Sequence, residues 1–272
     1  MKSRLNYITC KDIRTGFKIM RLVLRHHCLL IMLALLFNGT NRQLHAQSKK
    51  STVYSSLDKF DIKNGSYLLP QSLPKGKYHH AFSILYVIVP QDWAHDIVNA
   101  PMFNYSAKYT LPSGFNVQAN LATLFISSRV NAGPFWNYSF DKYHVGVGYQ
   151  VAFNFGILQQ FGFNTILTGW EQQPSLTLGY SFEKSAVTVR GDVYYTNSFH
   201  LSEGSNVISF TDGGLNGYSV TTSLEQRLWK DRVISFGVKI NYVRYHILAW
   251  PTFPVNSYRY YVPEFQVGLK FK

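Results

Sequence analysis

Residues 261–272, YVPEFQVGLKFK, alternate between apolar and polar side chains with a period of two. Successive side chains of a β-strand point to opposite faces, so this period predicts a strand with one apolar and one polar face. The apolar face would carry Tyr261, Phe265, Val267, Leu269 and Phe271. The polar face would carry Glu264, Gln266, Gly268 and Lys270. In an exported chain, such a strand is suited to contact lipid with one face and a polar lumen with the other.

The same alternation recurs along the chain and predicts ten strands. They cover residues 82–89, 102–111, 115–127, 134–140, 143–155, 175–182, 186–197, 218–229, 233–245 and 261–272. The connections are short at 111–114, 140–143, 183–185 and 229–232, long at 90–101, 156–173, 198–217 and 246–257, and intermediate at 128–133. An even strand number with alternating short turns and longer loops indicates an all-β, antiparallel, up-and-down transmembrane barrel with its short turns in the periplasm.

Two alternatives to ten strands remain open. Eight or twelve strands are possible, because residues 165–170 could extend a strand or add one. A secreted β-sandwich also alternates, but its outward face would be polar. Here the apolar face is uniformly large, and the polar face is rich in Gly, Asn, Gln and Ser. The pattern therefore favours the membrane barrel.

An apolar run near the N-terminus predicts export. Residues 28–37, CLLIMLALLF, follow a basic segment and precede Ala46. This order is typical of a secretory signal peptide, with cleavage expected after Ala46. The run is too short to cross a bilayer as a helix, which takes about 20 residues. Met20 is an alternative translation start, because a signal counted from Met20 has ordinary length.

The chain is thus predicted to divide into three parts. Residues 1–46 are the removed signal, residues 47–80 are a periplasmic N-terminal arm, and residues 81–272 are the barrel. Both cysteines, Cys10 and Cys28, lie in the signal. The mature chain would therefore form no disulfide and use no thiolate chemistry.

Charge and motifs give little support for other classes of protein. The chain carries 27 Lys and Arg against 14 Asp and Glu, and part of this excess lies in the signal. No basic cluster interleaved with aromatics indicates a nucleic-acid groove. The remaining excess fits contact with anionic lipopolysaccharide, a lumen that favours anions, or scattered solvated charge. His79 and His80 lack further metal ligands nearby, and no nucleotide or calcium motif is present. We expect neither a metal nor another cofactor.

The alternating pattern over residues 80–272 resembles the small, about ten-stranded outer-membrane β-barrel proteins of Gram-negative bacteria. The aromatic strand with Phe265 and Phe271 is similar to the segment that their barrel-assembly machinery engages, although Lys272 follows here. The resemblance implies an outer-membrane location and contacts with lipid, lipopolysaccharide and that machinery. It also implies a monomer. It carries no catalytic motif.

The polar faces predict a lumen lining. Its members are Lys108, Gln150, Arg190, Asp192, Glu225, Arg227, Lys239, Glu264 and Lys270. We expect Arg190 and Asp192 to face Glu225 and Arg227 on the next strand, and Lys239 to face Glu264. These charges could select small polar solutes, or they could pair into an internal plug that fixes the strand register.

Two other segments are candidates for binding. The apolar outer loops could form a site for an apolar ligand, or they could be strand extensions above the membrane. The residues of that loop site are Phe161, Phe163, Trp170, Trp250 and Phe253. In the arm, apolar residues could dock into the barrel mouth, namely Tyr54, Phe60, Tyr67, Leu68 and Leu69.

The sequence leaves three functions in consideration. The first is a narrow channel or uptake barrel, and the second is a closed structural barrel that presents its loops to a partner. The third is a hydrolase at the outer rim, with residues from two loops: Asp92, His95, Asp96, His200, Glu203 and Asp212. Since nothing in the sequence brings these six groups together, we do not expect an enzyme.

Overall fold

The computed structural model describes residues 62–71, 75–90, 99–124, 126–159, 164–211, 213–228, 232–246 and 258–271. The predicted signal and the first part of the arm lie outside these residues. The elements in chain order are α2 (Ile62–Gly65), β1 (Tyr78–Ile88), β2 (Asn99–Thr110), η1 (Pro112–Gly114), β3 (Phe115–Thr123), β4 (Ser127–Phe140), β5 (Tyr143–Leu158), β6 (Thr165–Ser181), β7 (Ser185–Glu203), β8 (Asn206–Thr211), β9 (Gly214–Arg227), β10 (Val233–Val243) and β11 (Tyr260–Phe271).

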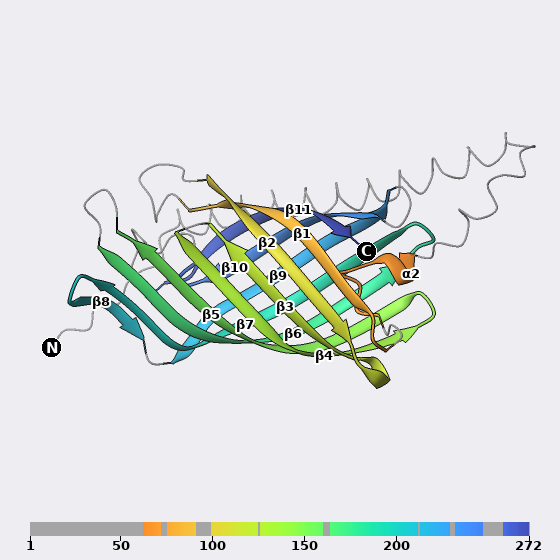
Figure 1. Cartoon of the computed structure of the whole chain (residues 1–272), viewed down its shortest axis with the longest axis horizontal. Helices are drawn as coiled ribbons and strands as arrows, with labels where there is room; N and C mark the ends of the chain where they lie inside the picture. Colours follow the sequence, from red (N-terminus) through yellow and green to blue (C-terminus); the bar gives the residue numbers. More distant parts are fainter. Residues whose placement is uncertain are drawn as a thin grey trace, which may run out of the picture. The chain divides into compact units, whose positions relative to one another are not determined.

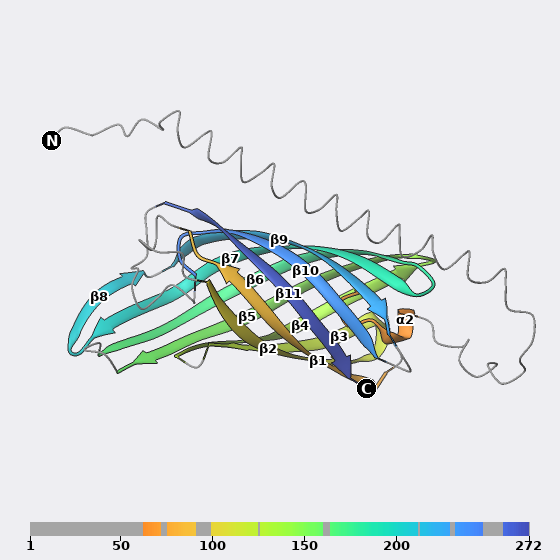
Figure 2. The ribbon, with the colours of Figure 1, turned by 90° about the horizontal axis from the view of Figure 1, so that it is seen from above.

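The strands form one antiparallel sheet that closes on itself (Figure 1 and Figure 2). Neighbours pair in the order β6, β5, β4, β3, β2, β1, β11, β10, β9 and β7, and β6 pairs with β7 to close the ring. The predicted ten-stranded barrel is therefore confirmed. β8 pairs with the last part of β7 and forms a hairpin beyond the ring. Closure leaves the wall without a free strand edge, and a membrane-spanning sheet needs this because lipid cannot satisfy backbone groups.

The outward face of the wall is apolar and the inward face is polar. Along β5, Tyr143 and Val147 are 61% and 51% exposed, whereas His144 and Gln150 are 2% and 0% exposed. The same alternation predicted the strand, and it places large apolar side chains outward on every second position. An exterior of this kind is suited to hydrocarbon and not to water.

Aromatic side chains form two bands on the exterior. We call the end with the turns at Pro112–Gly114 and 141–142 the turn end, and the opposite end the loop end. Exposed aromatics at the turn end include Tyr78, Phe115, Tyr138, Phe140 and Tyr143. At the loop end, Tyr218, Tyr242 and Tyr261 form one row across three paired strands. Aliphatic positions such as Val145, Val147, Leu176 and Leu178 lie between the bands. Aromatic girdles around an aliphatic band mark the two membrane interfaces.

Several strands are longer than the sequence pattern predicted. Residues 128–133 were expected to form a loop, but they belong to β4 and pair with β3 and β5. The loop expected at 156–173 is also wrong in most of its length, because β5 extends to Leu158 and β6 begins at Thr165. Residues 198–217 are mainly the ends of β7 and β9 together with β8. The pairing of β5, β6 and β7 continues beyond the loop-end aromatic band, and therefore converts expected loops into sheet.

The barrel interior has three layers. At the turn end, residues 62–71 lie inside the ring, and Ile62 and Leu69 are fully buried against Ala186 and Val233. The middle of the lumen holds polar and charged side chains around a cavity. At the loop end, apolar side chains from most of the strands gather inside the ring. This cluster includes Val87, Met102, Leu167, Phe199, Leu201, Val243, Tyr245 and Val262.

Candidate functional site

A single carboxylate of the barrel wall holds the backbone of the arm. Glu225, on the inward face of β9, is 1% exposed. It accepts hydrogen bonds from the backbone N–H groups of Tyr67 at 2.7 Å, Leu68 at 3.1 Å and Leu69 at 3.3 Å. The Ser66 hydroxyl also donates to it. A buried carboxylate is costly unless hydrogen bonds replace its hydration, and here the arm supplies those bonds.

Two lysines of the wall hold the arm by its carbonyl groups. Lys270 Nζ donates to the carbonyl oxygen of Gly65 at 2.6 Å, and Lys108 Nζ donates to that of Leu69 at 3.5 Å. Both lysine side chains are buried, at 6% and 2% exposed. The wall therefore presents an acceptor to the N–H groups of the arm and donors to its C=O groups. The arm is bound through its backbone, with charge-assisted hydrogen bonds.

Glycines of β5 and β6 give the arm the space that it occupies. A Cβ atom on Gly146 would lie 2.6 Å from the Pro70 Cβ, and one on Gly179 would lie 2.5 Å from the Leu69 Cδ1. Non-bonded carbon atoms do not approach this closely, so any larger residue at these positions would displace the arm. The inner wall at the turn end thus matches the shape of residues 62–71.

A hydrogen-bond network around one ion pair lines one side of the lumen at its middle. Arg190 Nε donates to Asp192 at 2.8 Å, and its second nitrogen donates to Gln150 Oε1 at 3.0 Å. Gln173 Nε2 donates to the same Asp192 oxygen at 3.0 Å. These residues come from β5, β6 and β7. The network therefore ties three adjacent strands together across their inward faces.

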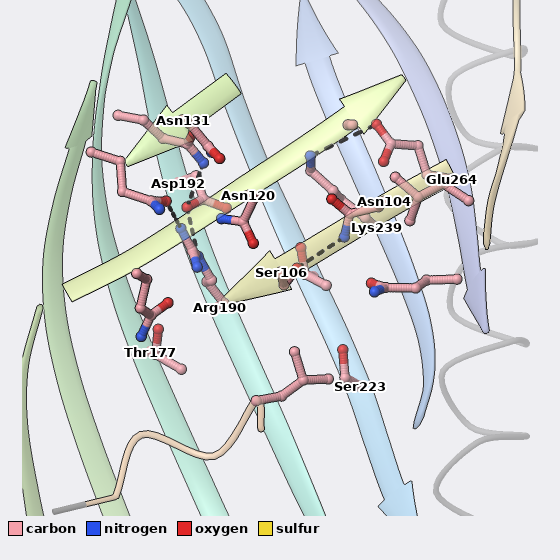
Figure 3. A pocket seen from close by; sticks show the side chains of 18 of the residues that line it. Asn104, Ser106, Asn120, Asn131, Thr177, Arg190, Asp192, Ser223, Lys239 and Glu264 are labelled. Carbon is pink, nitrogen blue, oxygen red and sulfur yellow. Dashed lines mark hydrogen bonds and ion pairs between the residues drawn. The ribbon is translucent and has the colours of Figure 1, made fainter. Parts of the chain in front are cut away.

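A second pair lies on the other side of the lumen. Lys239 Nζ on β10 is 3.7 Å from Glu264 on β11, and the two residues are direct partners in the strand register. His246 Nε2 also lies 3.0 Å from Glu264. Figure 3 shows Lys239 and Glu264 facing Arg190 and Asp192 across the cavity. The cavity thus has an ion pair on each side, and Arg129 and His246 also line it.

A third buried pair lies nearer the loop end. Arg129 on β4 contacts Glu171 on β6 at 3.1 Å. Glu171 is 1% exposed and also accepts from Tyr245 Oη at 2.7 Å and from Asn216 Nδ2 at 3.0 Å. Tyr245 follows the end of β10, and its hydrogen bond to Glu171 holds this part of the chain inside the lumen. The Tyr245 ring then packs against Phe199 with centroids 4.4 Å apart.

The structure places all the predicted lumen residues on the inward side of the wall, but it changes one predicted pairing. Asp192 is paired in register with Ser219 and Arg190 with Thr221, whereas Glu225 is paired with Ala186. The expectation that Arg190 and Asp192 face Glu225 and Arg227 is therefore wrong. The register of β7 with β9 begins at Ser185 and Gln226, and this offset directs Glu225 to the arm. Lys239 does lie opposite Glu264, as expected.

Sequence reasoning missed Arg129 and Glu171 and left the position of the arm open. Arg129 and Glu171 were overlooked because both fell in segments expected to be loops. The arm could be recognised only as a polar segment with a few apolar residues, of which Tyr67, Leu68 and Leu69 do lie at the barrel mouth. No signal in the sequence indicated the contact with Glu225, because Glu225 was expected to pair with charges on the neighbouring strand.

The proposed apolar loop site is only partly described. Phe161, Phe163, Trp250 and Phe253 lie outside the described residues. Trp170 belongs to β6 and not to a loop, is 49% exposed, and packs against Phe153 with ring centroids 4.6 Å apart. It lies on the exterior of the wall, so its assignment to a ligand site at the mouth is wrong.

Only two of the six rim candidates lie in the described part of the chain. Of the rim candidates, His200 and Glu203 are exposed on β7, while Asp92, His95, Asp96 and Asp212 lie outside the described part. Among the residues described, no group of three or more His, Cys, Asp or Glu could hold a metal ion. Within the same ranges, no helix is long and apolar enough to cross a membrane.

Comparison with known proteins gives structural neighbours only. No family model and no curated protein matches the sequence. Neisserial surface protein A matches with 13% identity over 72% of this chain and 96% of that chain, at a TM-score of 0.37. KdgM porin matches with 10% identity, 71% and 98% coverage, and a TM-score of 0.37. The toluene transporter TodX of P. putida matches with 10% identity, 73% and 89% coverage, and a TM-score of 0.32. These TM-scores are low, so the classification of the chain rests on the structure of the barrel wall.

The wall presents apolar side chains between two aromatic bands and leaves none of its strand edges unpaired. Strands that expose this much apolar surface to lipid can pair all of their backbone N–H and C=O groups only in a closed sheet. The described residues accordingly form a ten-stranded antiparallel β-barrel of the membrane-spanning type.

Proposed function

We propose that this protein is a narrow passage for small polar solutes that is closed at its periplasmic end by its own N-terminal arm. One observation carries the proposal: Glu225 of the wall accepts three backbone N–H groups of the arm. The lumen behind the arm is polar and contains a cavity of about 200 Å³. A barrel that served only as a scaffold would not need such a cavity next to a segment bound through its backbone.

The way in which the arm is bound is compatible with release. Its apolar contacts with the described wall are centred on Ile62 and Leu69, and its backbone is held by hydrogen bonds to charged side chains. When the arm leaves, water in the lumen can solvate Glu225, Lys108 and Lys270, which lowers the cost of uncovering them. The arm is also joined to β1 by a short connection, so it would return at high effective concentration.

The proposal is tested by single-channel conductance in planar bilayers. Glu225→Ala removes the acceptor of the arm, and we expect it to convert rare or absent conductance steps into frequent ones. Glu183→Ala is the matched control, because Glu183 is an exposed acid in the turn between β6 and β7. Identical traces from Glu225→Ala, Glu183→Ala and the wild type would count against the proposal.

A closed structural barrel is the second candidate. It is favoured by the apolar cluster at the loop end, which fills the ring with side chains such as Phe199, Leu201 and Tyr245. Under this alternative, neither removal of the arm nor loss of its contacts gives conductance. Native membranes would then yield the barrel with a stoichiometric partner or bound lipopolysaccharide.

A further inference from the structure

The cavity behind the arm has the size of a small solute. It measures about 200 Å³, and Tyr67, Leu68 and Pro70 of the arm form part of its lining. Since liquid water takes about 30 Å³ per molecule, the space suits a solute of roughly seven non-hydrogen atoms, between glycerol with six and erythritol with eight. The cavity is also adjacent to the segment whose release would open the periplasmic end.

One side of the cavity is lined by uncharged hydrogen-bonding groups. Asn104 and Ser106 on β2, Asn120 on β3 and Asn131 on β4 point into the space (Figure 3). The Asn120 amide makes no hydrogen bond to another described residue. The Asn104 Nδ2 donates to Ser83 and Ser106, both at 3.1 Å, and its carbonyl oxygen remains for a ligand. Side-chain amides offer both donors and acceptors, as a hydroxyl group does.

The charges around the cavity are balanced in pairs. Arg190 lies 2.8 Å from Asp192, and Lys239 lies 3.7 Å from Glu264. A ligand with a net charge would have to compete with one of these pairs and leave its partner uncompensated, which is unfavourable in a confined lumen. An apolar ligand would instead leave the amides without hydrogen bonds. Both classes fit the lining worse than an uncharged polar molecule.

We propose that this cavity binds a small, uncharged, hydroxyl-rich solute of the size of glycerol or erythritol. The amides of Asn104, Asn120 and Asn131 hydrogen-bond its hydroxyl groups, and the paired charges on the opposite wall exclude ions. The inference deepens the proposed passage and rests on it, because a solute reaches the cavity in the membrane when the arm moves. It adds the chemical class of the solute.

Equilibrium dialysis with radiolabelled erythritol tests the binding site directly. The protein is refolded in the presence of the probe, so that entry is not limiting, in a detergent whose headgroup is not a sugar. We compare the wild type, Asn120→Leu and the control Asn206→Leu, since Asn206 is exposed on β8. We expect saturable binding to the wild type and the control. Asn120→Leu should bind about tenfold more weakly, because the ligand loses its hydrogen bonds to the half-buried Asn120 amide. Unlabelled glycerol should compete, and the carboxylate erythronate should not.

Several outcomes would overturn the site. They are absence of saturable binding to the wild type, equal binding to Asn120→Leu, or stronger competition by erythronate or by the zwitterion glycine. Heat-modifiable migration on gels verifies that each variant folds, and Asn104→Leu replaces Asn120→Leu should the latter not fold. Because dialysis measures binding and not conduction, a silent bilayer would overturn the proposed passage while leaving this result standing.

Discussion

Glu225 on β9 accepts the backbone N–H of Tyr67 at 2.7 Å, although 158 residues separate the two in the chain. The acceptor is part of the barrel wall, and the donor is part of the arm that precedes the first strand. A carboxylate with this burial needs several donors, and its neighbours in the strand register supply none of the four that it has. The arm therefore supplies the hydrogen bonds that the buried Glu225 carboxylate needs.

Loss of the Glu225 carboxylate should expose the arm. Hydrogen bonds to charged groups contribute about 1.5–3 kcal/mol each, and about 1.4 kcal/mol corresponds to a factor of ten. We expect a cysteine placed at Leu68 to react with a maleimide at least about tenfold faster in Glu225→Ala than in the parent. Residues 47–272 contain no cysteine, so the refolded mature chain gives a clean background. Equal labelling rates in Glu225→Ala and in the Glu183→Ala control would show that the arm does not depend on Glu225.

A larger side chain at Gly179 should displace the arm without changing any charge. A Cβ there would lie 2.5 Å from the Leu69 Cδ1, so Gly179→Leu leaves no room for the arm. We expect the variant to form the barrel and to show more frequent conductance steps. The matched control is Gly191→Leu, where the nearest atom to an added Cβ is 4.0 Å away. Conductance from Gly191→Leu but not from Gly179→Leu would contradict the described position of the arm against Gly179.

The Phe135 ring inside the lumen occupies space that is free only because residue 148 is a glycine. A Cβ on Gly148 would lie 2.1 Å from the Phe135 ring, which also lies under the Arg190 guanidinium at 5.2 Å. Gly148→Ala should destabilise the barrel by about 1–3 kcal/mol, the usual cost of overpacking. The measurement is the urea midpoint of barrel unfolding in detergent. Combining the change with Phe135→Leu should restore part of the loss, and independence of the two changes would contradict this packing.

Glu171 and Arg129 should behave as a coupled pair. Removing one partner of a buried ion pair costs about 3–5 kcal/mol, because it leaves the other charge uncompensated. We therefore expect Glu171→Gln and Arg129→Met each to lower unfolding stability, and the double variant to lose less than the sum of the two. A double-mutant cycle from denaturant unfolding measures the coupling. Additive losses would mean that the contact at 3.1 Å contributes no net coupling.

The sequence predicts the ten membrane-crossing strands because lipid imposes a simple rule on them. Apolar side chains must point outward, so the period of two is visible in each crossing segment. Beyond the loop-end aromatic band the exterior meets water and the rule ends. There Leu167 points inward and is 1% exposed, while the next residue, Thr168, is exposed on the outer side. Ile166 is 39% exposed on that outer side, so both faces carry apolar residues there. The period of two is lost, and β6 could not be followed to its start at Thr165.

Partners within the lumen were harder to predict. The charges of β7 and β9 were assigned correctly to the interior, but a strand pattern does not give the stagger between neighbouring strands of a barrel. The predicted contact of Arg190 with Glu225 was therefore wrong, whereas Lys239 and Glu264 are direct partners in the strand register, as predicted. The arm has no periodicity, so no sequence rule could place Tyr67 against Glu225. The signal cleavage after Ala46, the monomeric state and the contacts with lipopolysaccharide and the barrel-assembly machinery stay predictions.

Deletion of residues 47–71, followed by single-channel recording in a planar bilayer, tests most directly whether the arm closes the lumen. The deletion leaves every strand from β1 to β11 intact, and heat-modifiable migration confirms that the barrel has formed. We predict reproducible unitary steps from the deletion variant and a quiet or rarely conducting wild type. Wild-type protein that conducts as well as the variant, or a correctly folded variant that stays silent, would contradict closure by the arm.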